Sequence, residues 1–273
     1  MTLPPLGSRE PWTGGAVTER ATCILAGNPG PMTLDGTNTW ILAEPGSRHC
    51  LVVDPGPDDA AHLHAIETAV DGRRVAAILL THGHPDHAEG AAALAARVGA
   101  GVRALDPAYQ LGTEGLTEGE HLNVDGLVVH IVATPGHTAD SLCLLLPADG
   151  ALLTGDTVLG RGTSVIAWPD GDLADYLGSL DRLRGLARNG ALDVLLPGHG
   201  PALRGAAEAR ALLEGYADHR RQRLELVRRA RRDGAGTAQE VVDAVYADVP
   251  GDVRAAALMS VQAQLDYLDA RGE

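Results

Sequence analysis

The sequence contains no phenylalanine and no lysine, and only 3% of its 273 residues are aromatic. Its core must therefore be built from Leu, Val, Ile and Ala, which are plentiful because hydrophobic residues make up 45% of the chain. No apolar run is long enough to cross a bilayer, and the N-terminus (MTLPPLGSREPWTGG) lacks the basic-then-apolar pattern of a signal peptide. We therefore expect a cytoplasmic protein without membrane contact.

Cysteine is scarce as well. Cys23, Cys50 and Cys143 are odd in number, lie in strand-like runs and show no CxxC spacing. This pattern predicts buried, reduced thiols.

Positive charge is also limited, and the formal net charge of −14 disfavours a protein that coats nucleic acid nonspecifically. One segment is an exception: residues 219–232 read HRRQRLELVRRARR, with seven arginines and one glutamate. This segment is either the solvated face of an amphipathic helix or a surface that guides RNA phosphates.

Up to about residue 205, short aliphatic runs alternate with Gly and Pro, which is typical of a layered α/β domain. The expected strands lie at 22–26, 38–44, 49–57, 75–80, 101–105, 127–133, 141–147, 151–155 and 193–198. Helices are expected at 59–70, at 88–98 and from about residue 172.

From about residue 206 the pattern predicts helices only. Apolar residues recur on one face of a long helix, TAQE (237–240) is a capping box that opens a second helix, and a third follows within 253–268. We therefore predict two domains, 1–205 and 206–273.

The segment THGHPDH (81–87) follows the buried strand 75–80. An extended backbone projects His82 and His84 to the same side, and Pro85 favours that backbone at His84. Asp86 and His87 then enter the following helix at its N-terminus, where Pro is tolerated and a carboxylate suits the helix dipole. Such an array suits two metal ions better than one.

Three other strand-like runs end in a potential ligand, namely His137, Asp156 and His199. The ends of successive strands in a layered α/β fold lie along one edge, so seven candidate ligands should converge there. They are His82, His84, Asp86, His87, His137, Asp156 and His199. We interpret the other six histidines as structural or surface groups: His49, His62, His64, His121, His130 and His219.

HGHPDH, PGHT, TGDT and PGHG, in this order, resemble the metal motifs of the metallo-β-lactamase superfamily. The resemblance implies an αββα sandwich with a dinuclear metal site at one edge. The segments 28–42, 158–166 and 216–223 and the three C-terminal helices are similar to the branch that includes beta-lactamase-like protein 2. Members with a complete winged helix continue into wing strands, whereas this chain ends at DARGE (269–273), so we expect a winged-helix-like module without a complete wing.

The resemblance also implies a role for each ligand. His82, His84 and His137 hold one Zn²⁺; Asp86, His87 and His199 hold a second; Asp156 bridges the two. The implied catalyst is metal-bound hydroxide, with Asp86 accepting a hydrogen bond from the attacking water. The three cysteines are not at ligand positions, unlike those of true lactamases.

Three functions are compatible with this sequence. The branch includes single-strand-specific endoribonucleases and is similar to thioesterases that release acyl chains from carrier proteins. We favour RNA cleavage, with acyl thioester hydrolysis as the alternative and a non-catalytic zinc protein third. The candidate substrate-binding residues are Met32, Leu34, Asn38, Arg228 and Arg231.

Overall fold

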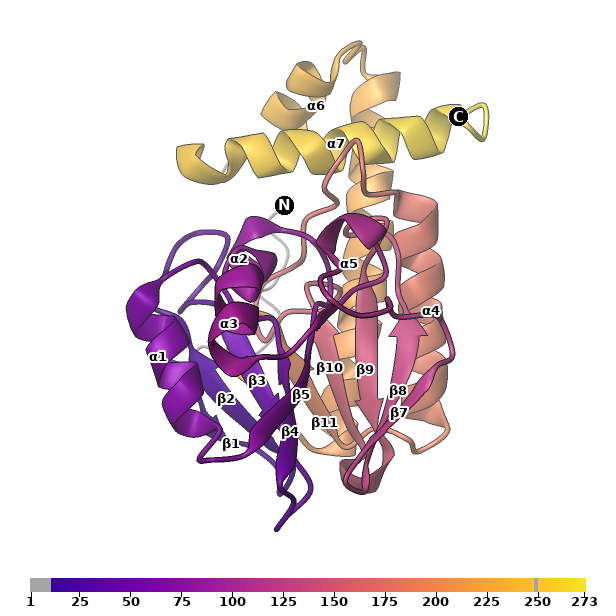
Figure 1. The fold of residues 1–273 in the computed structure, drawn as a ribbon. Helices are drawn as coiled ribbons and strands as arrows, with labels where there is room; N and C mark the ends of the chain where they lie inside the picture. The colour runs from indigo at the N-terminus through magenta and orange to yellow at the C-terminus, as the bar shows by residue number, and fades with distance from the viewer. Residues whose placement is uncertain (1–10, 248–249) are drawn as a thin grey trace.

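A computed structural model describes residues 11–247 and 250–273, apart from the side chain of residue 252. The first ten residues, which include most of the N-terminal segment considered above, lie outside the described residues. The strands form two six-stranded sheets, ordered β1-β2-β3-β4-β5-β6 and β12-β11-β10-β9-β8-β7 (Figure 1). Both sheets are mixed, because β4, β5 and β6 run parallel in the first and β10 and β11 run parallel in the second.

The strands of the first sheet are β1 (Gly15–Ala16), β2 (Ala21–Leu25), β3 (Asn38–Leu42), β4 (His49–Val53), β5 (Arg74–Leu79) and β6 (Val102–Arg103). Those of the second are β7 (His121–Val124), β8 (Leu127–Ala133), β9 (Leu142–Leu146), β10 (Ala151–Gly155), β11 (Val194–Pro197) and β12 (Leu203–Arg204). The helices are α1 (Ala60–Ala69), α2 (Pro85–Ala88), α3 (Ala91–Val98), α4 (Leu173–Arg188), α5 (Ala206–Arg232), α6 (Ala238–Val245) and α7 (Arg254–Asp269).

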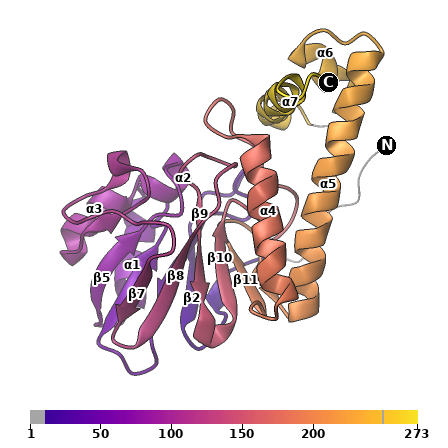
Figure 2. The ribbon, with the colours of Figure 1, turned by 90° about the vertical axis from the view of Figure 1, so that its right-hand side faces the viewer.

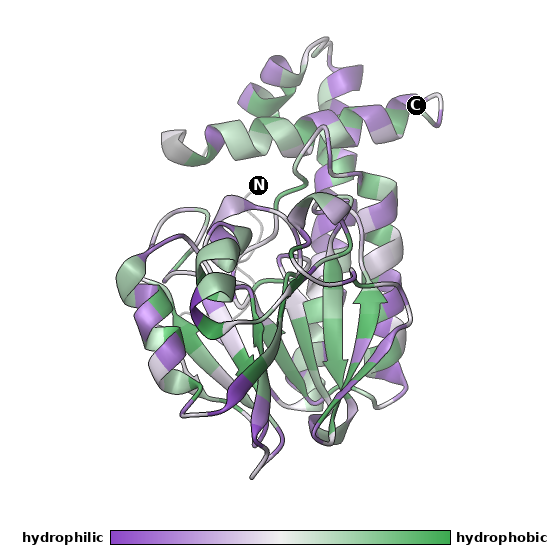
Figure 3. Cartoon of the chain, in the orientation of Figure 1, coloured by the Kyte–Doolittle hydropathy of each residue, from purple (hydrophilic) through white to green (hydrophobic). Residues whose placement is uncertain are grey.

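Alternating side chains place one face of each sheet against the other sheet. Trp40 and Leu42 of β3 point into the core between the sheets, where Leu144 of β9 and Leu153 of β10 meet them. Because successive side chains of a strand alternate, Ile41 faces the opposite way. The strands are the most hydrophobic part of the structure (Figure 3).

The two outer faces are covered by helices. On the first sheet, Ile41 and Ile78 pack against Ile66 of α1 and Leu94 of α3. On the second, the residues that point outward from β8 to β11 pack against α4 and α5, which lie side by side (Figure 2). These layers confirm the predicted αββα sandwich.

The C-terminal helices extend beyond one edge of the sandwich. The 27-residue helix α5 packs its first half on α4 and β11, and its second half reaches α6 and α7 (Figure 2). Thr237 and Glu240 form the expected capping box at the start of α6. No strand follows β12 within the described residues. The division at residue 206 stays a prediction, since α5 begins there but belongs to both parts.

Several local expectations differ from the structure. The helix expected at 88–98 begins only at Ala91, as α3, after the separate short helix α2; between them the backbone N–H of Gly90 donates to the carbonyl oxygen of Gly56 instead of continuing α2. Strands β1, β7 and β12 were not predicted, since two of them have two residues each and β7 (HLNV) is half polar.

Two expectations about composition can be compared with the structure. The three cysteines are buried and free, as predicted, and burial raises the pKa of Cys50 to about 11. Among the residues that the structure describes, no helix is both long and apolar enough to cross a membrane.

Candidate metal centre

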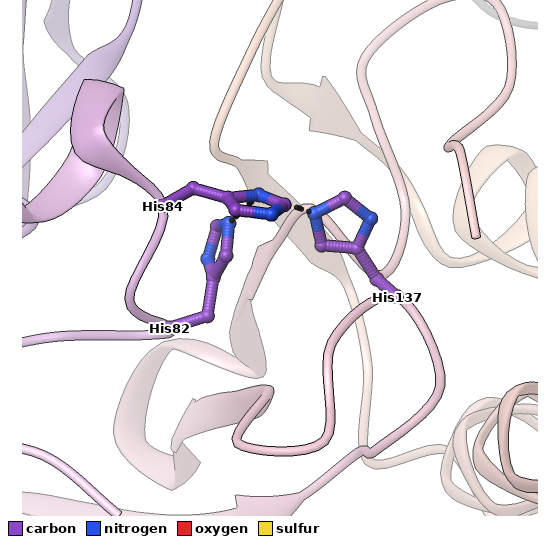
Figure 4. Close-up of side chains that lie close together, drawn as sticks. All are labelled: His82, His84 and His137. Carbon is purple, nitrogen blue, oxygen red and sulfur yellow. Dashed lines mark hydrogen bonds between the residues drawn. The ribbon is translucent and has the colours of Figure 1, made fainter. Parts of the chain in front are cut away.

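Three imidazoles from two strand ends face one another (Figure 4). His82 and His84 follow β5, and His137 follows β8. The Nδ1 atom of His84 lies 3.0 Å from Nε2 of His82 and 3.0 Å from Nε2 of His137. Three ring nitrogens therefore converge on one point, which is the arrangement that a single metal ion requires.

A second group of ligand atoms lies beside the first. His87, in the first turn of α2, places Nε2 3.1 Å from Nε2 of His199, which follows β11. The Oδ2 atom of Asp86 also lies 3.1 Å from Nε2 of His199. His87 and His199 are fully buried, whereas the Asp86 side chain is 31% exposed and can meet solvent.

Asp156, which follows β10, lies between the two groups. Its Oδ1 is 3.4 Å from Nε2 of His87, and its Oδ2 is 3.4 Å from Nε2 of His199 and 3.8 Å from Nε2 of His137. The fold thus brings all seven predicted ligands to one edge of the sheets. Their assignment as ligands of two ions stays a prediction.

The outer ring nitrogens are held by acceptors. Nδ1 of His137 donates to the carbonyl oxygen of Val165 at 2.7 Å, and Nδ1 of His199 donates to that of Gly36 at 3.2 Å. A proton fixed on Nδ1 leaves the inner Nε2 with a free lone pair, which is the form that binds metal.

Asp54, which the sequence analysis did not single out, orients two of the ligands. Its Oδ2 accepts hydrogen bonds from Nδ1 of His87 at 2.9 Å and from the Thr81 hydroxyl at 2.7 Å. That hydroxyl lies 3.1 Å from Nδ1 of His82. The sequence signal for Asp54 was its place at the end of the buried run HCLVVD, which lies beside the strand that carries the motif.

The cluster fits a bound cation. In the neutral rings, with the proton on the Nδ1 atom that faces an acceptor, the Nε2 atoms of His87 and His199 would point lone pairs at each other across 3.1 Å. Oδ1 of Asp156 is buried and has no hydrogen-bond partner among the described residues. A positive charge at this point satisfies both the lone pairs and the carboxylate oxygen.

Four histidines of the cluster fall into two groups, one with lowered and one with raised pKa values. Burial lowers the pKa of His82 well below its usual range and that of His137 to about 4. Burial also opposes protonation of His87 and His199, but the Asp156 carboxylate outweighs it and raises both pKa values, that of His199 to about 9. Without metal, positive charge therefore gathers around Asp156.

A cavity of about 280 Å³ opens onto this cluster. His137 and Asp156 line it together with Met32 and Leu34, two of the predicted substrate-binding residues. Other parts of its wall come from the C-terminal helices. The residues from α5 and α7 are His219, Arg220, Arg223, Ala256, Ala257 and Ser260.

The other predicted substrate-binding residues are not brought to this cavity. Asn38 is buried and donates to the carbonyl oxygens of Pro197 and Gly200, so the structure places it as a support for the loop that carries His199. Arg228 and Arg231 pair with Glu273 and Asp269. His219, which we interpreted as a structural or surface group, instead lines the cavity; its position one turn before Arg223 was the signal.

Replacing Asp54 with Asn is expected to lower zinc affinity about 10- to 100-fold. Both carboxylate oxygens accept, Oδ1 from the Thr81 backbone N–H and Oδ2 from the Thr81 hydroxyl and His87, whereas an amide must turn its NH2 group toward one of these donors. Competition with a chromophoric zinc chelator measures this. The control is Asp59→Asn in the same loop, where Asn caps α1 as well as Asp does and affinity should not change. Equal affinity of Asp54→Asn and wild type would show that the imidazoles are oriented by other groups.

Comparisons with known proteins agree with this geometry. The metallo-beta-lactamase superfamily model matches residues 32–199, and the beta-lactamase associated winged helix domain matches residues 237–273. A Caenorhabditis elegans protein named beta-lactamase-like protein 2 homolog is 33% identical over 268 residues, 92% of this chain and 85% of that protein. An atrochrysone carboxyl ACP thioesterase of Aspergillus fumigatus is 33% identical over 87% of this chain and 76% of its own.

A solved structure is similar over nearly the whole chain. A metallo-beta-lactamase family protein from Thermus thermophilus, 25% identical, superposes with a TM-score of 0.77 and covers 94% of this chain and 95% of that one.

Proposed function

This chain belongs to the metallo-beta-lactamase superfamily, and from that membership we propose that it is a dinuclear zinc hydrolase that cleaves acyl thioesters. His82, His84 and His137 would hold one ion, and Asp86, His87 and His199 the other, with Asp156 shared between them. Bound zinc supplies a water of lowered pKa and neutralises negative charge that develops on the substrate. Imidazole and carboxylate ligands suit zinc.

The chain's own residues position the reaction. Asp86 is 31% exposed against 12% for Asp156, so its carboxylate is the one of the two that can accept a hydrogen bond from the attacking water. Asp54, Val165 and Gly36 fix the imidazole rings from behind. Ligands that are held before substrate arrives need no reorganisation during the reaction.

The cavity beside the cluster is the observation that carries the substrate class. Leu34, Leu159, Val253, Ala256 and Ala257 give part of its wall an apolar lining, and it has the size of a pocket for a small acyl group. Two relatives are named atrochrysone carboxyl ACP thioesterases, at 33% and 31% identity. An acyl chain in this cavity lies next to His137 and Asp156.

RNA cleavage, which the sequence favoured, is the second candidate. The arginines in the cavity wall, Arg161, Arg220 and Arg223, favour it because guanidiniums suit a phosphate. The arginines further along α5 weigh against it: Arg228, Arg229, Arg231 and Arg232 each pair with a carboxylate of Glu225, Asp269 or Glu273. Paired guanidiniums release fewer counterions when RNA binds.

A non-catalytic zinc protein is the least compatible of the three functions. Structural zinc sites are closed and four-coordinate, whereas this cluster opens onto a cavity and includes a partly exposed carboxylate.

The two substrates are separated by assaying zinc-loaded protein with an acyl thioester of a short uncharged thiol and with a single-stranded RNA oligonucleotide at low salt. We expect thioester cleavage and intact RNA. Changing Arg228, Arg229, Arg231 and Arg232 together to Gln should then leave thioester kcat/KM within about twofold, since surface ion pairs contribute little.

The opposite outcome identifies RNA as the substrate. RNA would be cut, its KM would rise in the four-arginine variant, and the salt dependence of kcat/KM would flatten by roughly 0.7 in log-log slope for each lost phosphate contact.

A further inference from the structure

Three basic side chains of α5 lie on one side of that helix and line the cavity that also contains His137 and Asp156. They are His219, Arg220 and Arg223. Residues four apart on a helix are neighbours, so His219 and Arg223 are stacked one turn apart with Arg220 beside them. None of the three belongs to the metal-binding cluster.

Arg220 is a buried cation that is only partly compensated. It is 5% exposed, donates through Nη2 to the carbonyl oxygen of Ser164, and lies 4.8 Å from the centre of the Tyr176 ring. Its Nε is buried without a hydrogen-bond partner among the described residues. An unsatisfied donor on a buried charge costs free energy unless a ligand completes it.

Arg223 and His219 also have a buried nitrogen atom without a hydrogen-bond partner among the described residues. Arg223 donates through Nη1 to the carbonyl oxygen of Val245 at 3.2 Å and stacks on Tyr246 at 4.4 Å, while its Nε has no partner among the described residues. Nδ1 of His219 is likewise buried and unpaired. Burial and the two neighbouring guanidiniums lower the pKa of His219 to about 3, so it is a neutral ring with one N–H to donate.

The two guanidiniums also lack acidic partners. Within residues 11–247 and 250–273, no ion pair involves Arg220 or Arg223, in contrast to Arg228 and Arg231 on the exposed part of the same helix. Two cations without an ion pair and an imidazole donor therefore border a cavity whose wall also has an apolar part, formed by Leu34, Leu159, Val253, Ala256 and Ala257. This combination is complementary to an anion at the end of a short apolar chain.

We propose that His219, Arg220 and Arg223 form a carboxylate-binding subsite, and that the substrate is a thioester whose acyl group ends in a free carboxylate. The inference rests on the proposed thioesterase function and names its substrate class. Planar guanidiniums bind a carboxylate through paired N–H donors. A volume of about 280 Å³ accommodates a short acyl chain but not a run of nucleotides.

The test compares two substrates of the same shape. One is the glutaryl thioester of N-acetylcysteamine, and the other is the glutaramyl thioester, in which a neutral amide replaces the carboxylate. With zinc-loaded wild type, kcat/KM is expected to be about 10- to 100-fold higher for the acid, mainly through KM, because hydrogen bonds to charged groups are worth that factor. Equal values for the two substrates would overturn the subsite.

Variants of Arg223 then test whether this residue causes the preference for the acid substrate over the amide. Arg223→Gln is expected to reduce the acid-to-amide ratio by about 10-fold or more, and Arg223→Lys to retain part of it. The matched control is Arg221→Gln on the same helix, whose side chain is exposed and pairs with Asp218, and which should keep the wild-type ratio. A ratio that survives in Arg223→Gln would also overturn the subsite.

A binding measurement keeps this inference separate from the catalytic proposal. Calorimetry with non-hydrolysable thioether analogues of the two substrates needs no turnover. If wild type binds the acid analogue about 10-fold more tightly than the amide and Arg223→Gln does not, the subsite stands even where no thioester is cleaved. If thioesters are cleaved and the two analogues bind equally, the thioesterase stands and the subsite fails.

Discussion

Replacing Asp156 with alanine is expected to remove both the bound metal and the hydrolytic activity. The carboxylate lies between the two ligand groups, within 3.4 Å of His87 and His199 and 3.8 Å of His137. Without it, the cluster loses the carboxylate that both ligand groups share and the negative charge that would offset a bound cation. We expect kcat/KM to fall about 1,000-fold or more, the equivalent of several kcal/mol of lost charge stabilisation.

Elemental analysis checks the metal directly. Wild-type protein purified without chelator should approach two zinc equivalents, and Asp156→Ala should hold fewer than one at the same free zinc concentration. The control is Asp218→Ala, which removes an exposed carboxylate from α5 and should keep both metal and activity. A wild-type stoichiometry of one at saturating zinc contradicts the dinuclear proposal.

The second large effect on activity is expected from Gly198→Ala, which adds a single methyl group. A Cβ on Gly198 would lie 2.5 Å from Oδ1 of Asp156 and 2.7 Å from Cε1 of His87. Both atoms belong to the buried cluster, so Gly198→Ala must push two ligands apart. Overpacking costs about 1–3 kcal/mol of stability, and a shift of about 1 Å in a reacting group costs on the order of 100-fold in rate.

The predicted signature of Gly198→Ala is a folded protein with reduced zinc affinity and about 100-fold lower kcat/KM. Thermal unfolding, zinc titration and the thioester assay measure these three properties. Gly185→Ala in α4 is the matched control, because nothing lies within 4 Å of its Cβ position and the change should add up to about 1 kcal/mol of helix stability. Wild-type zinc affinity in Gly198→Ala would mean that the cluster can shift freely.

The convergence of the candidate ligands could be predicted from sequence because each one follows a strand. His137, Asp156 and His199 come directly after β8, β10 and β11, and the ends of neighbouring strands share an edge whatever the loop details. Asp54 obeys the same rule after β4. It was missed because a single carboxylate beside Pro and Gly has the signature of an ordinary turn.

The cavity beside the candidate metal centre could not be predicted in the same way. Its wall depends on how α5 and α7 pack against the loop that follows β10, and this is set by contacts between residues more than 50 positions apart, such as Arg220 with Ser164. For the same reason the arginine-rich segment was treated as one surface. The structure divides it into three residues that line the cavity (His219, Arg220 and Arg223) and an ion-paired part at 228–232.

The continuous helix α5 has a consequence for how this architecture can diverge. One helix is anchored on the sandwich by its first half and supplies the cavity wall from its middle, while Ala256, Ala257 and Ser260 of α7 supply more of that wall. Substitutions in α7 can therefore reshape this cavity while the loops that carry the candidate metal ligands keep their positions. In proteins built this way, the identity of the substrate is free to drift while the bond-breaking chemistry is inherited unchanged.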